Sequence, residues 1–263
     1  MSQNPIASLY KDSVDQLLCT ALDVGEGLLI NGATVHRTED TVERICRAFG
    51  AVHVEVFCIP SLILAAVRME DGGYSSQNRR IYSSSNHFFR MDRFNTISRE
   101  LCARKITLDQ AQEKIREAKK QEAYPLWIQF LGFFLASGSF SLFFGGSLLD
   151  ALCAAAIGLA LCFIKQILPK SVNPLSSTLI CSILAGTLSI LLTWVGFADS
   201  YDKVMIGTIM LLIPGVSFGT SIRDLLGGDT VAGLLQLIQA ILLAAIIAFG
   251  YTIPYFLLQS LLV

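Results

Sequence analysis

The stretch with the most evident chemistry is an apolar segment that carries a helix break and a pair of opposite charges. Residues 205–229 (MIGTIMLLIPGVSFGTSIRDLLGGD) contain Pro214-Gly215 near the middle and Arg223-Asp224 near the end. A proline removes a backbone donor and clashes with the preceding turn, and every backbone group freed in hydrocarbon needs a partner. Because broken helices often form the substrate sites of secondary transporters, this break is a candidate for part of a transport path. The alternative is a proline kink that packs on neighbouring helices.

Polar side chains beyond the break could bind a substrate at low energetic cost. Ser217, Thr220 and Ser221 supply hydroxyl groups, whereas a charge at the centre of a bilayer would cost several kcal/mol. Arg223 follows the break by roughly 13 Å, at about 1.5 Å per residue. There it could attract a carboxylate substrate, pair with Asp224, or extend to the membrane interface.

A second polar cluster, His36-Arg37-Thr38-Glu39-Asp40, lies in the first part of the chain. It offers a base, a cation and two carboxylates near one predicted helix start, which an amide hydrolase using His36, Glu39 or Asp40 would need. The alternative is that the acidic residues stabilise the helix dipole by about 0.3–1 kcal/mol. The sequence contains no zinc, nucleophile-elbow, Walker or dinucleotide motif. We therefore expect no metal site, no cofactor and no ATP-driven pump.

The charges divide the 263 residues into two regions. Residues 1–124 hold 16 of the 20 Lys and Arg residues and 16 of the 21 Asp and Glu residues. We predict a soluble cytoplasmic domain at 1–124 and a transmembrane domain at 125–263. The net charge of −1 offers no case for nucleic-acid binding, and the polar first residues predict no signal peptide. The seven cysteines show no C-x-x-C pair, which favours reduced thiols.

Apolar runs in the second region predict about five transmembrane helices. Each run is near the ~20 residues that a bilayer needs, and together they cover residues 125–144, 148–167, 174–198, 204–224 and 230–250. The last apolar run continues beyond residue 250 to Val263, and Pro254 is expected to kink it. Small residues such as Gly138 and Gly158 allow the first two spans to pack closely. So few polar groups in five spans favour a partner subunit or a second copy of the chain.

Loop charges predict the orientation of these spans, because cytoplasmic loops carry an excess of Lys and Arg. Basic side chains precede the first span and follow the second and fourth, namely Arg116, Lys119, Lys120, Lys165, Lys170 and Arg223. The opposite loops contain Asp150, Asp199, Asp202 and a lone Lys203. With an odd number of spans, this places the N-terminus in the cytoplasm and the C-terminus outside.

Residues 1–124 predict an α+β domain. Apolar periodicity favours a helix at 13–31 that ends before Gly32, and a second helix that Thr38 caps and Gly50 ends. Strand-like runs cover 52–58, 62–69 and 77–83, with a hairpin turn at Asp71-Gly72-Gly73. Two further helices follow, and the last begins at Thr107 with Gln110 in the capping-box position. Arg79 and Arg80 are interpreted as a solvated strand edge. The fold class is thus a membrane α-helical bundle with an N-terminal cytoplasmic α+β domain.

Three motifs, in this order, resemble the threonine/serine exporter family. They are N-G-A-T-V-H-R-T-E-D-T-V at 31–42, L-L-I-P-G-V at 211–216 and I-R-D-L-L-G-G-D-x-x-x-G at 222–233. The resemblance covers nearly the whole chain. Full-length members of the family resemble this unit joined to a smaller module of about five spans. The chain therefore looks like the larger, YjjP-like subunit of the split two-component form.

The resemblance implies export of small polar metabolites across the bacterial inner (plasma) membrane. Fused members are associated with threonine and serine, and the split form with dicarboxylates such as succinate. The implied partner is a small membrane subunit of about five spans on a separate chain. Motif matching assigns Gly32, Arg37, Glu39 and Asp40 to the soluble motif, and Pro214, Gly215, Arg223, Asp224 and Asp229 to the membrane motif.

We therefore predict one subunit of a secondary exporter driven by a proton or ion gradient, and not an enzyme. The break at Pro214-Gly215, with Ser217 and Thr220, would contribute to the substrate site. Arg223 and Asp224 would attract or gate the anionic group at the cytoplasmic mouth. The alternatives are a membrane-anchored amide hydrolase that uses the soluble domain, and a structural or regulatory subunit with no site of its own.

Overall fold

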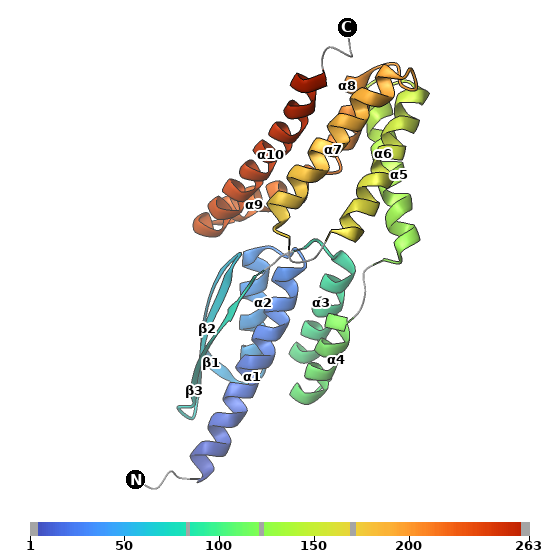
Figure 1. The fold of residues 1–263 in the computed structure, drawn as a ribbon. Helices are drawn as coiled ribbons and strands as arrows, with labels where there is room; N and C mark the ends of the chain where they lie inside the picture. The colour runs from blue at the N-terminus through green and yellow to red at the C-terminus, as the bar shows by residue number, and fades with distance from the viewer. Residues whose placement is uncertain (1–4, 83–84, 121–123, 169–171, 259–263) are drawn as a thin grey trace. The chain divides into compact units, whose positions relative to one another are not determined.

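The computed structural model describes residues 5–82, 85–120, 124–168 and 172–258 (Figure 1). The chain divides into two compact units. The first comprises Met1–Ala123 and Val216–Leu237, and the second comprises Tyr124–Gly215 and Ile238–Val263. Some predicted features lie outside the described residues: the polar start, residue 83 of the third strand, Lys170, and the last part of the final apolar run.

The first unit combines helices with a small antiparallel sheet, as predicted for the soluble domain. The sheet has the order β1-β2-β3. Strand β1 pairs with β2 from Ala51↔Met69 to Ile59↔Leu62, and β2 pairs with β3 as far as Arg68↔Tyr74. The elements are α1 (Pro5–Ile30), α2 (Val35–Ala48), β1 (Ala51–Ile59), β2 (Leu62–Met69), β3 (Tyr74–Arg80), α3 (Phe88–Cys102), α4 (Leu108–Lys120), α9 (Gly215–Gly227) and the start of α10 (Thr230–Leu258).

Glycine positions predicted most element ends correctly. Gly32 and Gly50 follow α1 and α2 with φ of +98° and +95°, a left-handed conformation that glycine adopts without strain. Gly72, with φ of +87°, lies in the predicted turn between β2 and β3. The prediction that Thr38 caps the second helix is wrong: α2 begins one turn earlier, with Thr34 as its N-cap.

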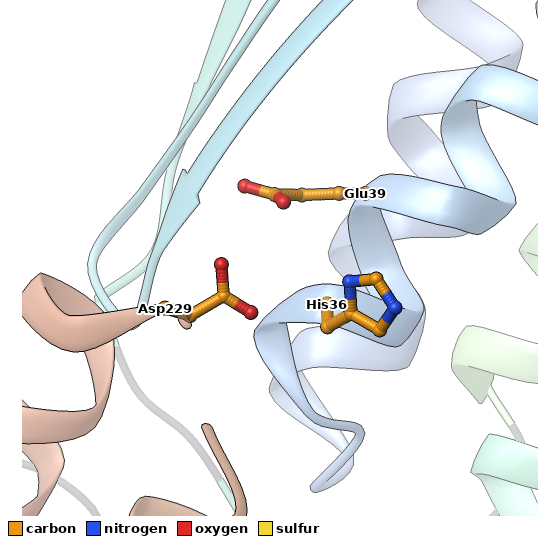
Figure 2. A group of neighbouring side chains, drawn as sticks. All are labelled: His36, Glu39 and Asp229. Carbon is orange, nitrogen blue, oxygen red and sulfur yellow. The ribbon is translucent and has the colours of Figure 1, made fainter. Parts of the chain in front are cut away.

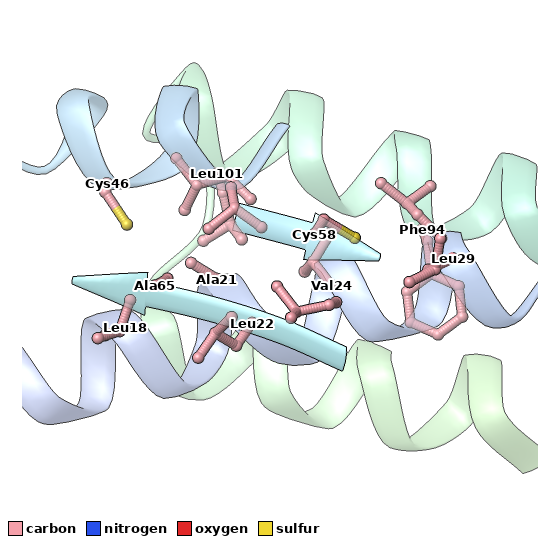
Figure 3. Close-up of a cluster of buried hydrophobic side chains, with 14 of the residues drawn as sticks. Leu18, Ala21, Leu22, Val24, Leu29, Cys46, Cys58, Ala65, Phe94 and Leu101 are labelled. Carbon is pink, nitrogen blue, oxygen red and sulfur yellow. The ribbon is translucent and has the colours of Figure 1, made fainter. Parts of the chain in front are cut away.

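Helix α1 contributes the largest share of the core of this unit. It contacts α2, α3 and α4 and the strands β2 and β3. Its fully buried Leu18 and Leu22 belong to one apolar cluster with Phe94 of α3 (Figure 3). A Cβ atom at Gly27 would overlap the Phe94 ring, so this glycine permits the close approach of α1 and α3. Ala232, on the first turn of α10, is buried in the same cluster.

Two polar features of this unit bear on the sequence predictions. Thr107 and Gln110 form the predicted capping box, because the Thr107 amide donates to Gln110 Oε1 (3.0 Å) and the Gln110 amide donates to Thr107 Oγ1 (3.3 Å). Arg79 is not a solvated edge residue. Its Nε lies 3.2 Å from Asp23 Oδ1, and although burial alone would lower the pKa of Arg79, the charge of Asp23 raises it.

The second unit contains α5 (Leu126–Phe143), α6 (Leu148–Ile167), α7 (Pro174–Trp194), α8 (Tyr201–Ile209) and the larger part of α10. Four of the described helices, namely α5, α6, α7 and α10, are long and apolar enough to cross a membrane. The expected count of five is not confirmed. The predicted span at 204–224 is interrupted, because α8 ends at Ile209 and α9 begins at Gly215, and a proline disfavours helical conformation in the residue before it. Pro254 lies inside α10, which continues to Leu258.

Small residues allow close helix contacts in the second unit, as predicted for the first two spans. A Cβ atom at Gly138 of α5 would lie 3.2 Å from the Ala151 carbonyl oxygen of α6. A Cβ atom at Gly158 of α6 would lie 2.7 Å from the Phe133 carbonyl oxygen of α5 and would also meet the Ser137 side chain. Backbones approach this closely only where side chains are small.

Asp150 connects the start of α6 to the start of α8. Its Oδ2 accepts a hydrogen bond from the Ser147 amide (2.9 Å), and its Oδ1 accepts from the amides of Asp199 (2.8 Å) and Ser200 (2.9 Å). The side chain is buried, and these three donors satisfy both of its oxygens. Asp150 therefore stabilises the fold of the second unit.

Candidate functional site

The start of α2 positions the polar run at residues 36–40. Thr34 accepts a hydrogen bond from the Arg37 amide (3.4 Å), and Thr38 Oγ1 donates back to the Thr34 carbonyl (3.0 Å). Because residues three apart share a face of a helix, His36 and Glu39 project from the same side of α2. Arg37, one position on, projects from a different face.

A tight turn between α9 and α10 positions the acidic residues of the second motif. The Gly228 amide donates to the Leu225 carbonyl (3.3 Å), and the Asp229 amide donates to the Asp224 carbonyl (3.0 Å). Gly228 has a φ of +98°. These features define a Schellman motif, which explains the glycine at position 228. The turn brings the backbone of Asp229 back against that of Asp224.

The structure brings Glu39 and Asp229 together with His36. Their side-chain donor atoms, one imidazole nitrogen and two carboxylate oxygens, lie within 4.8 Å of one another. Figure 2 shows the carboxylate of Asp229 between α2 and its own turn, facing Glu39 and His36. These are donor types found in metal sites. Sequence analysis assigned Glu39 and Asp229 to separate motifs, and the first unit contains both.

Glu39 is held in place by the edge strand of the sheet. Its Oε1 accepts a hydrogen bond from the Cys58 amide of β1 at 2.7 Å, a group that has no strand partner on that side. Burial raises the pKa of Glu39, and the charges of Asp229 and Asp224 raise it further, against the opposing effects of Cys58 and His36. The site thus contains several carboxylates in mutual electrostatic repulsion.

Asp224 lies within the same electrostatic group and is 1% exposed. Its Oδ2 accepts from Gln236 Nε2 of α10 (3.1 Å), and Thr220 donates to Gln236 Oε1 (3.1 Å). Asp224 Oδ1 and Asp229 Oδ2 are buried without a hydrogen-bond partner among the described residues. Pairing with Asp224 is one of the three possibilities considered for Arg223, and it is not among the ion pairs of the described residues. Burial raises the pKa of Asp224, whereas the charge of Arg223 lowers it to a smaller extent.

A pocket of about 350 Å³ in the first unit carries the two candidate cations. Arg37 of α2 and Arg223 of α9 line it, together with Thr220 and backbone or side-chain atoms of Gly32, Ala33, Thr34, Phe88, Met91, Val216 and Gly219. Arg37 Nη2 donates to Asn95 Oδ1 (2.8 Å), which leaves other guanidinium donors available. Within the part of the chain that the structure describes, Arg223 has no hydrogen-bond or ion-pair partner.

The remaining predicted residues lie elsewhere. Asp40 is exposed and pairs with Arg44 on the same helix at 3.2 Å. Ser217 is on α9, but it does not line the pocket. Pro214 and Gly215 belong to the second unit. The structure therefore brings together Arg37, Arg223, Thr220 and Gly32 in one pocket, and Glu39 with Asp229 in one cluster.

Sequence reasoning missed the residues that support these groups. Phe88 and Met91 line the pocket, and nothing in their local sequence distinguishes them from core residues. Gln236 had a detectable signal, because Gln236 and Gln239 are the only amide side chains in the otherwise apolar run 231–250. The Cys58 amide could not have been found, since its role depends on β1 being an edge strand.

The apolar helices indicate a membrane protein, and two guanidinium groups line a pocket in its first unit. The family model described as "Putative threonine/serine exporter" (ThrE) matches residues 20–258. The chain belongs to this family of membrane transporters, which confirms the resemblance inferred from the order of the three motifs. No curated protein and no solved structure matches the chain.

Proposed function

We propose that this chain is the larger subunit of a secondary exporter that works with a smaller membrane subunit on a separate chain. Its substrate is a small carboxylate, either threonine or serine, or a dicarboxylate such as succinate. The complex lies in the bacterial inner membrane, with the N-terminus of this chain in the cytoplasm and its C-terminus outside. Membership of the exporter family and the apolar helices support the transport function.

The observation that carries the substrate class is the pair of guanidinium groups in one pocket. Arg37 and Arg223 come from different helices and line the same cavity with the Thr220 hydroxyl. Guanidinium groups suit carboxylates because their donors can form charge-assisted, paired hydrogen bonds. The volume of about 350 Å³ is at the small end of ligand pockets, which agrees with a substrate of amino-acid or dicarboxylate size.

We propose that this pocket admits substrate from the cytoplasm and, as a separate element, that the break at Pro214-Gly215 contributes to the transport path. The segment between α8 and α9 leaves the helical conformation, and irregular backbone at membrane depth is tolerated only if it lines a cavity or packs on protein. Asp224 and Asp229 shape the pocket indirectly, because they fix the end of α9 that carries Arg223. The coupling ion and the rest of the path are assigned to the partner subunit or to a second copy of this chain.

Transport by proteoliposomes that contain this chain and its partner tests the proposal. Labelled serine, threonine and succinate would be loaded inside, and exchange would be measured for the wild type, Arg37→Gln and Arg223→Gln. Loss of a charge-assisted contact of about 1.5–3 kcal/mol should raise the substrate concentration for half-maximal exchange by about 10- to 150-fold. The matched control is Arg47→Gln, since Arg47 is on α2 but pairs with Glu43 on the solvent side (2.7 Å).

The outcomes separate the three function classes. Exchange that Arg37→Gln and Arg223→Gln weaken but Arg47→Gln does not would support a substrate site in this chain. Exchange that none of the three changes would favour a structural or regulatory subunit. No exchange, together with amide hydrolysis by the full chain that Glu39→Gln abolishes, would favour the hydrolase. The full chain is needed because Asp229 lies outside residues 1–124.

A further inference from the structure

Three side chains from two distant parts of the chain converge in the first unit with their donor atoms side by side. His36 and Glu39 share one face of α2, and Asp229 follows the Schellman turn after α9 (Figure 2). One imidazole nitrogen and two carboxylate oxygens lie within 4.8 Å of one another. We propose that His36, Glu39 and Asp229 bind a divalent transition-metal ion. This site is separate from the transport function proposed above.

A buried carboxylate oxygen of one ligand provides independent support. Asp229 Oδ2 is buried without a hydrogen-bond partner among the described residues. The neighbouring Asp224, which is 1% exposed, adds a further negative charge. Burial raises the pKa of its carboxyl group, although the Val35 amide and Gln236 lower it. A buried acceptor left without a partner destabilises the fold, and more so if it is charged. None of the ion pairs in the described chain joins Glu39, Asp224 or Asp229 to a Lys or Arg side chain. A bound cation would supply the missing partner and offset the repulsion among these carboxylates.

The donor set selects a class of metal. Imidazole suits ions such as Zn²⁺ and Fe²⁺, carboxylates suit Mn²⁺, and all-oxygen sites suit Mg²⁺ and Ca²⁺, so one imidazole with two carboxylates favours Zn²⁺, Fe²⁺ or Mn²⁺. Donor atoms bound to Zn²⁺ at about 2.0–2.2 Å in tetrahedral geometry lie roughly 3.3–3.6 Å apart. The arrangement within 4.8 Å therefore needs only small side-chain rotations to close around an ion. Three protein ligands would leave one or more positions for water.

Hydrogen bonds from neighbouring groups hold the carboxylates of the cluster in place. The Cys58 amide donates to Glu39 Oε1 at 2.7 Å, which fixes one carboxylate oxygen. Gln236 fixes Asp224 in the same way (3.1 Å). Hydrogen bonds of this kind orient metal ligands and are part of most metal sites. Local sequence motifs give no signal for such a set, because Glu39 and Asp229 are about 190 residues apart in the sequence.

Metal binding by the purified full chain in detergent tests the proposal. The protein would be stripped with a chelator, dialysed, and titrated with Mn²⁺ and Zn²⁺. Bound metal would be measured by elemental analysis, and affinity by calorimetry. Mn²⁺ is the primary probe because the seven cysteines offer thiolates that prefer Zn²⁺. The site predicts one Mn²⁺ per chain and an electron paramagnetic resonance spectrum with coupling to one imidazole nitrogen.

Variants at the ligands and at a neighbouring carboxylate complete the test. His36→Ala and Asp229→Asn should each lower the affinity at least tenfold, and His36→Ala should remove the nitrogen coupling. Asp40→Asn is the matched control, because Asp40 is next to Glu39 on α2 but exposed and paired with Arg44. Glu39→Gln keeps an acceptor for the Cys58 amide, so it tests ligation with little risk to the fold. Circular dichroism would verify helix content in each variant.

The proposal is overturned if the folded wild type binds neither ion in a fixed ratio. It is also overturned if His36→Ala, Glu39→Gln and Asp229→Asn bind as tightly as Asp40→Asn, since the ion would then lie elsewhere. Transport assays give a separate answer: a chain that exports substrate but binds no metal contradicts only this inference, and a chain that binds metal at these residues without transport contradicts only the proposed function.

Discussion

Replacing Gly228 with alanine should open the turn that joins α9 to α10, whereas the same change at Gly227 should not. A Cβ atom at either position meets nothing within 4 Å, so crowding does not distinguish them. The difference is in the backbone: Gly228 has a φ of +98°, and Gly227 is the last residue of α9 without a positive φ. The pair therefore isolates the conformational requirement of the Schellman turn.

The expected effect follows from this geometry. A residue with a Cβ atom in a left-handed conformation costs about 1–2 kcal/mol, so Gly228→Ala should destabilise the turn by that amount. Gly227→Ala should be neutral or stabilising by up to about 1 kcal/mol, because alanine has the higher helix propensity. The Asp229 amide, which donates to the Asp224 carbonyl at 3.0 Å, should become accessible to solvent more often in Gly228→Ala.

Two measurements on the purified full chain would detect the change. Thermal unfolding in detergent should show a Tm lower by about 2–8 °C for Gly228→Ala, at about 2–4 °C per kcal/mol. Hydrogen exchange at the Asp229 amide should be about 5- to 30-fold faster, the ratio that corresponds to 1–2 kcal/mol. Equal Tm values and equal exchange rates in the two variants would refute the assignment of a left-handed Gly228 in this turn.

Two further changes test the packing of the units. Gly158→Ala should lower the stability by about 1–3 kcal/mol, because its Cβ atom would lie 2.7 Å from the Phe133 carbonyl oxygen. Gly132→Ala is the control, since a Cβ atom there has nothing within 4 Å. SDS-induced unfolding measures the difference, and equal unfolding midpoints for the two variants would contradict the close contact of α5 and α6. Thr107→Ala should lower stability by about 0.5–2 kcal/mol through loss of the capping box with Gln110, measured as Tm, and an unchanged Tm would show that the cap does not stabilise α4.

Local features of the first unit could be predicted from sequence because local interactions determine them. Gly32 and Gly50 mark helix ends since they take left-handed conformations there, and the capping box at Thr107 requires only residues three apart. The start of α2 was predicted one turn too late for an instructive reason. The sequence predicts Glu39 as a first-turn residue that favours the helix dipole, but its carboxylate accepts from the Cys58 amide of β1, a partner that only the fold supplies.

The interrupted span shows where hydropathy stops being informative. Residues 204–224 are apolar enough to cross a bilayer, and Pro214 is a visible break in that run. Hydropathy does not report what the apolar side chains pack against. Ala232, at the start of α10, is buried in the apolar core of the first unit, and residues 216–237 belong to that unit. Length and composition therefore predicted one span at 204–224, whereas residues 204–215 belong to the second unit and residues 216–224 to the first.

This division also changes the meaning of the two sequence motifs. When residues 31–42 and 222–233 are assigned to separate domains, their charged residues need two explanations, one soluble and one within the membrane. In the structure both motifs contribute to the first unit, where Arg37 and Arg223 line one pocket and Glu39 and Asp229 share one cluster. Each motif supplies one cation to the pocket and one carboxylate to the cluster. The charges in the two motifs are thus complementary parts of one arrangement, and a substitution in either motif should affect the environment of the other.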